Sequence, residues 1–239
     1  CLKKSEPILR RTLIDRLRFP PAPRLRRIHS GSALLPKLTT RLYLQPRSGC
    51  RTPPRASSSP MKTSAVDRSI ELFLARNIRD GSRVLDVGCG SGWASLAVAR
   101  RRPGCAVTAI DRDLRAVRET ERLVRKNGYG AAVRCTVGEA ERLRETFERN
   151  TFECAVAVNA FHHFRDPRRV LKGIRAVLKP RGTLLLSEFT ADYGGRHDEC
   201  PRYSAEQLRW FMTESGFRAI TAAVQPPGII LLRSRKKPG

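Results

Sequence analysis

The sequence predicts an α/β domain, a doubly wound and mostly parallel sheet with helices on both faces. Three observations lead to this fold class. From residue 61 onward, short apolar runs of strand length alternate with segments of helical spacing, and strands separated by helices form right-handed βαβ units. A glycine-rich turn over 88–92 follows the first apolar run. The last two runs are joined by Gln-Pro-Pro-Gly over 225–228, which is typical of a hairpin and adds an antiparallel strand.

The first half of the domain alternates strands, helices and glycine turns. Pro103 and Gly104 break one helix, and Asn127 with Gly128 ends the next. In chain order we expect a helix over 64–77, a strand over 83–87, a helix over 93–101, a strand over 106–110, a helix over 114–127, a strand over 133–137 and a charged helix over 140–149.

The second half continues the same pattern. Pro167 suits the start of a helix, and Ser204 with Gln207 forms a capping box before a helix that Gly216 ends. In chain order we expect a strand over 154–158, a helix over 167–178, a turn over 179–182, a strand over 183–187, a helix over 204–215 and strands over 217–224 and 229–234.

Residues 1–60 differ in composition from the rest of the chain. They contain 14 Lys and Arg residues against only Glu6 and Asp15. Such a segment buries too little apolar surface to offset its chain entropy, so we expect a disordered extension over 1–60 and a folded domain over 61–239. The composition also resembles an organelle transit peptide, and Met61 could be the biological start. The sequence leaves these alternatives open.

Charge and cysteine content indicate which classes of partner and which cellular compartment suit the chain. The chain has 47 Lys and Arg against 22 Asp and Glu, a net charge of +25, and a basic surface attracts polyanions such as nucleic acids. Seven cysteines without a Cys-x-x-Cys pair favour a reducing compartment. We therefore predict a cytoplasmic location, with organelle import as the alternative. No apolar run approaches the ~18–20 residues that span a bilayer, which predicts no membrane span.

The glycine turn carries the most informative motif. Glycines allow positive φ and a close approach of ligand to backbone, and the following helix N-terminus offers free N–H groups. A dinucleotide fingerprint would place its third glycine at position 93, where this chain has Trp93. The strand also carries Asp86, two residues before Gly88. A carboxylate there repels a pyrophosphate and favours a ligand with a cationic amino group.

Three acidic residues follow three successive strands. Asp86 lies in the first strand, Asp111 ends the second, and Glu139 comes just after the third. Because parallel strands end at one edge of the sheet, these side chains should reach one crevice. Their oxygens match an amino group, two ribose hydroxyls and an adenine amino group in turn.

On these residues the chain resembles class I S-adenosylmethionine-dependent methyltransferases over roughly residues 64–234. The segment 86–92 is similar to the family's first motif, and Asn-Ala-Phe-His-His-Phe over 159–164 resembles a segment of the small-molecule, ubiquinone- and menaquinone-biosynthesis branch. The resemblance implies a Rossmann-like sheet of order 3-2-1-4-5-7-6 with the last strand antiparallel. It also implies S-adenosylmethionine as cofactor. The cofactor-binding residues that it implies are Asp86, Gly88, Cys89, Gly90, Gly92, Trp93, Asp111, Arg112, Glu139, Ala140 and Asn159.

Two histidines are the candidates for catalysis. A neutral His162 or His163 could remove a proton from the acceptor or orient it. Together with His197 and Cys200 they could ligate a metal, but the spacing is not a recognised one, so we predict no metal.

Methyl transfer to a small-molecule acceptor is the leading interpretation. The segment after the fourth strand lacks the Asp/Asn-Pro-Pro-Tyr of amine methylation and the Pro-Cys of cytosine methylation. The alternatives are a nucleic-acid methyltransferase or RNA-binding protein, a nicotinamide-dependent oxidoreductase, and a cofactor-binding protein without turnover.

Overall fold

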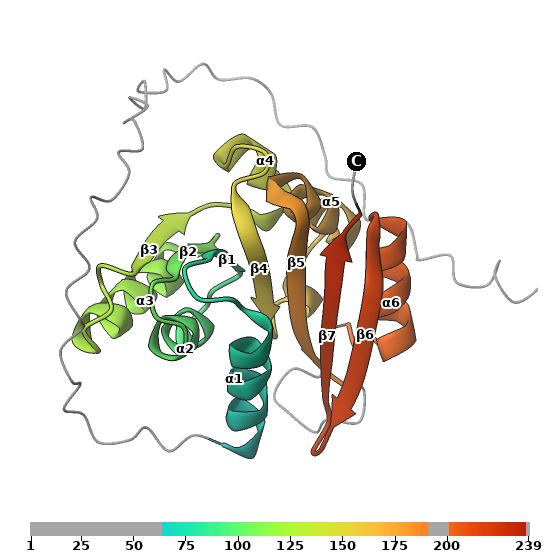
Figure 1. Cartoon of the computed structure of the whole chain (residues 1–239), viewed down its shortest axis with the longest axis horizontal. Coiled ribbons are helices and arrows are strands. Elements are labelled where there is room, and N and C mark those ends of the chain that lie inside the picture. Colours follow the sequence, from blue (N-terminus) through green and yellow to red (C-terminus); the bar gives the residue numbers. More distant parts are fainter. Residues whose placement is uncertain (1–63, 191–200, 238–239) are drawn as a thin grey trace, which may run out of the picture. The chain divides into compact units, whose positions relative to one another are not determined.

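The structure is a computed structural model that describes residues 64–190 and 201–237 (Figure 1). The predicted extension over 1–60 therefore lies outside the described residues. A single sheet of seven strands runs through the domain. The strands are β1 (Arg83–Val87), β2 (Ala106–Asp111), β3 (Val133–Val137), β4 (Phe152–Val158), β5 (Leu178–Phe189), β6 (Phe217–Gln225) and β7 (Ile229–Lys236).

Helices connect these strands in the expected alternation. The α-helices are α1 (Ala65–Asn77), α2 (Trp93–Arg101), α3 (Leu114–Lys126), α4 (Leu143–Thr146), α5 (Pro167–Val177) and α6 (Ala205–Glu214), and two short 3₁₀ turns are η1 (Ala140–Arg142) and η2 (Phe161–His163). The capping box at Ser204 and Gln207 is confirmed, with Pro167 in the first turn of α5. No helix within the described residues is long and apolar enough to cross a bilayer.

The strand order is β3-β2-β1-β4-β5-β7-β6, which confirms the predicted topology. Strand β1 pairs in parallel with β2 and β4, at Leu85↔Thr108 and Leu85↔Ala155 for example. The hairpin of β6 and β7 places β7 antiparallel between β5 and β6. The strand order changes direction between β1 and β4, because β2 and β3 lie on one side of β1 and β4 and β5 lie on the other. This change creates a crevice at the carboxyl ends of β1, β2 and β4, where ligands bind in such sheets.

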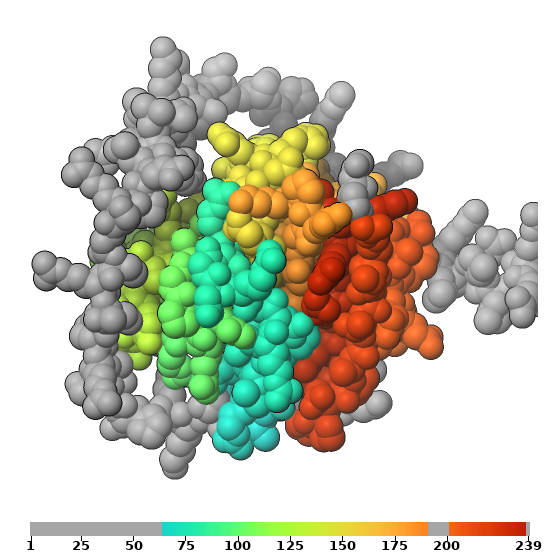
Figure 2. All heavy atoms as spheres, viewed as in Figure 1, coloured from blue at the N-terminus to red at the C-terminus, as the bar shows by residue number. Residues whose placement is uncertain are grey.

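Two hydrophobic clusters lie on opposite faces of the sheet. Leu85 and Val87 belong to the cluster that includes buried residues of α4, α5 and α6. Val84 belongs to the cluster that includes α1, α2 and α3. Because successive strand residues point to opposite faces, Asp86 shares the α2 face with Val84. Figure 2 shows α1 packed between α2 and β7, where Ile70 and Leu231 join the same cluster.

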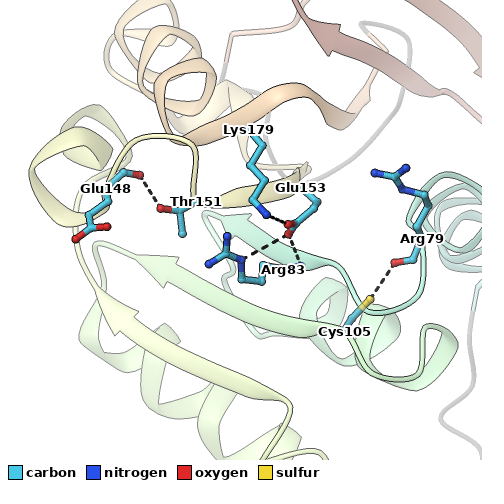
Figure 3. Close-up of polar contacts among 7 residues, drawn as sticks. All are labelled: Arg79, Arg83, Cys105, Glu148, Thr151, Glu153 and Lys179. Carbon is cyan, nitrogen blue, oxygen red and sulfur yellow. Dashed lines mark hydrogen bonds and ion pairs between the residues drawn. The ribbon is translucent and has the colours of Figure 1, made fainter. Parts of the chain in front are cut away.

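A polar cluster holds the amino ends of the strands, away from the crevice. Figure 3 shows Arg83 and Lys179 converging on the carboxylate of Glu153, and the Arg83 N–H donates to that carboxylate at 2.8 Å. Burial raises the pKa of Glu153, but the hydrogen bonds from Lys179 and Arg83 outweigh it and leave the pKa below its usual value. This cluster joins β1, β4 and β5 at their starts.

The predicted helix over 140–149 is wrong in length. The segment forms only η1 and α4; α4 ends at Thr146, and its C-cap Phe147 has an extended backbone (φ −129°, ψ 146°). Phe147 packs edge-on against Phe152 with ring centroids 5.3 Å apart. Helical spacing continues in the sequence, but docking of Phe147 on the core turns the chain back toward β4.

Strand β5 is longer than predicted and includes the segment expected to be a turn. Leu178 already pairs with Phe152, and the register then shifts so that Cys154 pairs with Thr183. Arg181 takes up the irregularity with a φ of 62°. A side chain at Gly182 would meet the Lys179 carbonyl oxygen at 2.8 Å, so this position requires glycine. The turn signal is thus real, but it marks a bulge within a strand.

Candidate functional site

A cavity of about 590 Å³ lies at the carboxyl ends of β1, β2 and β4. Small-molecule pockets have volumes of about 300–1,000 Å³, so one cofactor with part of an acceptor fits this space. Nine of the eleven predicted cofactor-binding residues line it, namely Asp86, Gly88, Cys89, Gly90, Trp93, Asp111, Arg112, Ala140 and Asn159.

The turn between β1 and α2 brings backbone to the cavity wall. Gly88 and Gly90 both have positive φ, 73° and 52°. A Cβ at Gly88 would meet the Ala160 Cβ at 2.8 Å, whereas a Cβ at Gly90 would have nothing within 4 Å. Gly88 therefore permits close packing of the turn on the chain after β4, and Gly90 leaves an open surface on which a ligand can approach the main chain.

Gly92 is not among the residues that line the cavity, so its predicted cofactor contact stays a prediction. It is the N-cap of α2 with a φ of 83°. A Cβ there would meet the Thr120 side chain at 2.6–2.8 Å. Its role is to let α2 pack against α3, because a threonine of α3 occupies the space that a side chain would need.

Asp86 is the buried carboxylate of the site. Its side chain accepts a hydrogen bond from the Ser95 hydroxyl at 2.6 Å, and the residue is 1% exposed. Burial raises the pKa of Asp86 to about 6, against the hydrogen bond from Ser95 and with help from the charge of Asp111. A buried carboxylate that has no Lys, Arg or His partner among the described residues is suited to a cationic group from a ligand.

Asp111 ends β2 and holds the glycine turn. One carboxylate oxygen accepts from the Gly90 N–H at 2.9 Å, and the other accepts from the Asp113 N–H at 2.9 Å. The Gly88 and Cys89 N–H groups both donate to the Ile110 carbonyl, at 2.8 and 3.1 Å. These bonds fix the end of β2 against the turn after β1, which brings Asp86 and Asp111 to one cavity.

Glu139 does not join them, contrary to the prediction. Its residue is exposed and absent from the cavity lining, while its neighbours Gly138, Ala140 and Glu141 line the cavity. Glu139 itself has an extended backbone (φ −84°, ψ 135°), and the 3₁₀ turn η1 begins at the next residue. Sequence reasoning missed Glu141 as a lining residue because its position depends on the 3₁₀ turn η1. Its carboxylate accepts from the Arg165 N–H at 2.9 Å.

The chain after β4 forms the opposite wall. Asn159 has a φ of 50°. Its N–H donates to the Ser187 carbonyl at 2.9 Å, and its side-chain oxygen accepts from the Ser187 hydroxyl at 3.2 Å. This left-handed residue turns the chain sharply so that Ala160 lies under Gly88. Asparagine tolerates that conformation better than most residues.

The two predicted histidines separate in the structure. His163 is exposed and lines the cavity, whereas His162 is buried and does not, and a catalytic role for either histidine stays a prediction. The His162 Nδ1 lies 2.7 Å from Glu188 Oε1, and its N–H donates to Glu188 Oε2 at 3.1 Å. Glu188, at the end of β5, was missed by sequence reasoning. The signal for it is an acid two residues after the apolar run Leu184–Leu186 of β5.

The described part of the chain contains no group of side chains that could form a metal site. Within 64–190 and 201–237, no three His, Cys, Asp or Glu side chains gather in a way that could hold a metal ion. His197 and Cys200, the other members of the candidate set, lie outside the described residues.

The cavity is acidic although the molecule is basic. Asp67 at the start of α1 lines it together with Asp86, Asp111, Asp113 and Glu141, and Arg112 is the single Lys or Arg in the lining among the described residues. Such a wall attracts cations and repels phosphates and carboxylates. The charge of the lining is therefore opposite to the net charge of the chain.

Comparison with known proteins identifies relatives of the domain. Residues 62–222 match the family described as "Methyltransferase domain". The O-methyltransferase resE of Aspergillus sclerotiorum is 27% identical over 179 residues, which cover 69% of this chain and 66% of that protein. The mitochondrial ubiquinone biosynthesis O-methyltransferase of Schizosaccharomyces pombe is 28% identical over 131 residues, or 53% and 45%.

Solved structures support the fold. A SAM-dependent methyltransferase from Aquifex aeolicus has a TM-score of 0.61 at 20% identity, covering 72% of this chain and 90% of that one. The [4+2]-cyclase SpnF has a TM-score of 0.64 at 22% identity, covering 72% and 82%. The chain spans between about a quarter and two thirds of the length of the curated relatives that it matches.

Proposed function

The chain belongs to the methyltransferase domain family, and from this membership we propose that it uses S-adenosylmethionine to methylate a small-molecule acceptor. One observation carries the proposal. Two carboxylates, Asp86 and Asp111, flank the open backbone of Gly90 in one acidic cavity. A cationic sulfur nucleoside matches this combination of charge and space.

The residues present fit the cofactor at three points. Asp86 would accept hydrogen bonds from its amino group, and the free lone pairs of Asp111 would accept from ribose hydroxyls. Gly138 and Ala140 would hold the adenine through backbone and van der Waals contact, in place of the Glu139 side chain. When bound, S-adenosylmethionine supplies a methyl group on a sulfonium with a good leaving group.

The chain's own contribution is to position the acceptor and to keep water out. Methyl transfer depends mainly on alignment of the nucleophile. His163 and Phe164 line the cavity beside Asn159, and His163 would orient the acceptor or remove its proton. The acidic lining disfavours an acceptor that carries phosphates, which supports a small, uncharged or cationic acceptor over a nucleic acid inside the cavity.

The rival cofactor is disfavoured by the same wall. A nicotinamide dinucleotide would bring its pyrophosphate against Asp86 and Asp111, which would repel it.

Cytoplasmic location, and organelle import through residues 1–60, stay predictions. The relative from S. pombe that is named mitochondrial motivates the second of these.

Calorimetric titration tests the proposal. The full chain should bind S-adenosylmethionine and S-adenosylhomocysteine but not NADH. Asp86→Ala and Asp111→Ala should each weaken binding by about 1.5–3 kcal/mol, because charge-assisted hydrogen bonds are lost. Glu148→Gln, at an exposed acid without an ion-pair partner in the described part of the chain, should leave the affinity unchanged.

Turnover is tested separately with the methyl-labelled cofactor and a metabolite extract. A labelled small molecule that forms with wild-type protein, and forms more slowly with His163→Ala, supports the enzyme. Cofactor binding without any labelled product would reject turnover and leave a binding protein. Unchanged affinity in both aspartate variants would reject the site.

A further inference from the structure

Helix α3 carries a line of basic residues that the proposed methyl transfer does not use. We call it the α3 basic stripe; it consists of Arg115, Arg118, Arg122, Arg125 and Lys126. At 3.6 residues per turn these side chains fall within an arc of about 100° on the helix. All five are exposed. The opposite face holds Val117, Thr120 and Val124, which are buried against the sheet and α2.

Within residues 64–190 and 201–237 the stripe has no neutralising acid beside it. Glu119 and Glu121 are the only acids in α3, and their helical positions put them at the two margins of the stripe. In the described ranges no Asp or Glu oxygen lies within 4.0 Å of a side-chain nitrogen of the stripe. Like charges four residues apart, such as Arg118 and Arg122, repel each other and weaken a helix.

Helix stability does not explain the first half of the stripe. Cations favour the last turn of a helix, where Arg125 and Lys126 lie. Arg115 and Arg118 lie near the first turn, where the helix dipole favours anions, and that turn contains no acid. Unpaired arginines that oppose the dipole suggest a partner outside the fold.

We propose that the α3 basic stripe binds the phosphodiester backbone of a nucleic acid. Guanidinium groups present a planar fork that matches phosphate oxygens, and four of the five residues are arginine. From Arg115 to Lys126 the helix rises about 16 Å at 1.5 Å per residue. Since a strand of nucleic acid carries one phosphate per about 3.4 Å, the stripe spans four to five phosphates.

The stripe is a docking surface distinct from the cavity. Asp111, Asp113 and Glu141 line the cavity and repel phosphates, so the backbone of the bound strand stays outside it. None of the five stripe residues lines the cavity. This inference therefore goes beyond the proposed function, and loss of the stripe leaves cofactor binding intact.

A membrane surface is the less suitable partner. Membrane-binding helices combine cations with apolar side chains that enter the lipid. In α3 the one exposed large apolar side chain is Leu114, at the end of the helix, and the stripe itself carries none. Nothing along the stripe is able to insert into a bilayer.

The test compares two fourfold variants of the full chain that have equal net charge. The first changes Arg115, Arg118, Arg122 and Arg125 to Gln, which keeps helix propensity. The second changes four exposed arginines elsewhere, which also lack ion-pair partners in the described ranges, to Gln; they are Arg149, Arg181, Arg218 and Arg235. Binding of 20-nucleotide oligouridylate and oligothymidylate is measured by fluorescence anisotropy from 50 to 200 mM NaCl.

Wild-type affinity should fall steeply with salt, and the stripe variant should lower the slope of log K against log salt by about three, since each phosphate contact on a single strand contributes about 0.7. Over this salt range the wild type should lose about 50-fold more affinity than the stripe variant. Unchanged calorimetric affinity for S-adenosylhomocysteine shows that the stripe variant is folded.

Three results would overturn the inference. One is a salt slope that falls in the second variant and stays at the wild-type value in the stripe variant. Another is stripe-dependent binding to vesicles containing 30% phosphatidylserine without binding to either oligonucleotide, which would assign the stripe to anionic lipid. The third is no binding of either oligonucleotide by the wild type.

Discussion

Among single residues, Asp86 shows how the site and the fold compete. The fold places this carboxylate in the interior with one hydroxyl as its hydrogen-bond partner, and burial raises its pKa to about 6. The charged form that a cationic ligand needs is therefore the form that the folded protein tolerates least. Active sites commonly hold such groups at a cost to stability.

We predict opposite effects of Asp86→Asn on stability and on binding. Because the folded-state pKa is raised, Asp86 adds stability below about pH 4, and this contribution is lost as the pH rises through about 6. Near pH 7.5 the free energy of unfolding of the variant should be about 1–3 kcal/mol higher than that of wild type, so the variant is more stable. Near pH 4.5 this gain in stability should be small. Urea denaturation at both pH values measures it. A variant less stable than wild type at pH 7.5 would contradict the prediction.

Binding to wild type should follow the ionisation of the same group. Affinity for S-adenosylmethionine should be full above about pH 6 and about tenfold weaker at pH 5, because the protonated carboxyl no longer pairs with an ammonium. Asp86→Asn should bind weakly with little change between pH 5 and 7.5. A pH dependence that persists in the variant would assign the titration to another residue.

Glu188 is the second residue whose importance appears only in the structure. It is 1% exposed, and its carboxylate accepts from the His162 ring and from the backbone N–H groups of His162 and Phe189. Since an ionised carboxylate only accepts, the His162 Nδ1 is the donor. We predict that Glu188→Gln lowers the free energy of unfolding by about 2–4 kcal/mol, because the charge-assisted bonds are lost in a buried position.

The matched control is again Glu148→Gln, which should change the free energy of unfolding by less than about 0.5 kcal/mol. Both variants are measured by urea denaturation with wild type alongside. Equal values for the two variants would mean that the pair with His162 does not hold the chain after β4 in place.

Of the elements, the strand–turn–helix unit of β1, its glycine turn and α2 positions most of the site. The turn residues have similar backbone conformations, but their surroundings differ. Gly88 faces Ala160, Gly92 faces Thr120, and Gly90 faces the open cavity. Gly88 and Gly92 therefore serve packing, and Gly90 serves the approach of a ligand.

A pair of glycine variants separates these roles. Gly88→Ala should lower the free energy of unfolding by about 3 kcal/mol or more, because positive φ and overlap with Ala160 add together. Gly90→Ala should cost only about 1–2 kcal/mol from its φ, yet weaken cofactor binding at least tenfold by filling the open face. Thermal melts and titration calorimetry measure the two effects. Wild-type affinity in Gly90→Ala would show that no ligand contacts this backbone.

Elements also show where local patterns stop being sufficient. The charged segment over 140–149 has helix-forming residues, but packing of Phe147 on Phe152 limits α4 to Leu143–Thr146. The Lys-Pro-Arg-Gly segment over 179–182 has turn residues, but pairing with β4 on both sides of it makes it a bulge within β5. In both segments a contact made in the folded chain, Phe147 on Phe152 or β5 on β4, overrides local preference.

At the scale of the molecule, charge is segregated. The chain carries a net charge of +25, while the cavity lining has five acids and one arginine among the described residues. The exposed basic residues repel one another when the chain is compact, and salt screens this repulsion with a Debye length of about 10 Å at 0.1 M.

We therefore predict that salt stabilises the protein. The melting temperature should rise by about 2–4 °C between 20 and 200 mM NaCl, which corresponds to about 1 kcal/mol for a domain of this size. The rise should be smaller in the fourfold α3 stripe variant, which has less repulsion to screen. Differential scanning calorimetry measures both. A melting temperature that falls with salt would show that attractive ion pairs outweigh the repulsion.

Much of the fold and part of the site follow from local sequence. Alternating apolar periodicity sets the order of strands and helices, and parallel connection requires the strand ends to meet at one edge. That rule is sufficient to bring Asp86, Asp111 and the glycine turn together, as the structure confirms. The seven-stranded order came from resemblance to a family, and the pairing of strands confirms it.

The orientation of individual side chains needed the folded chain. Glu139 is exposed and does not line the cavity, whereas Glu141, within the 3₁₀ turn η1, does. Of two adjacent histidines, Glu188 draws His162 into the interior and His163 remains at the cavity. The partners of His162 and Glu141, which are Glu188 and the Arg165 N–H, lie on other segments, and periodicity within one segment contains no information about them.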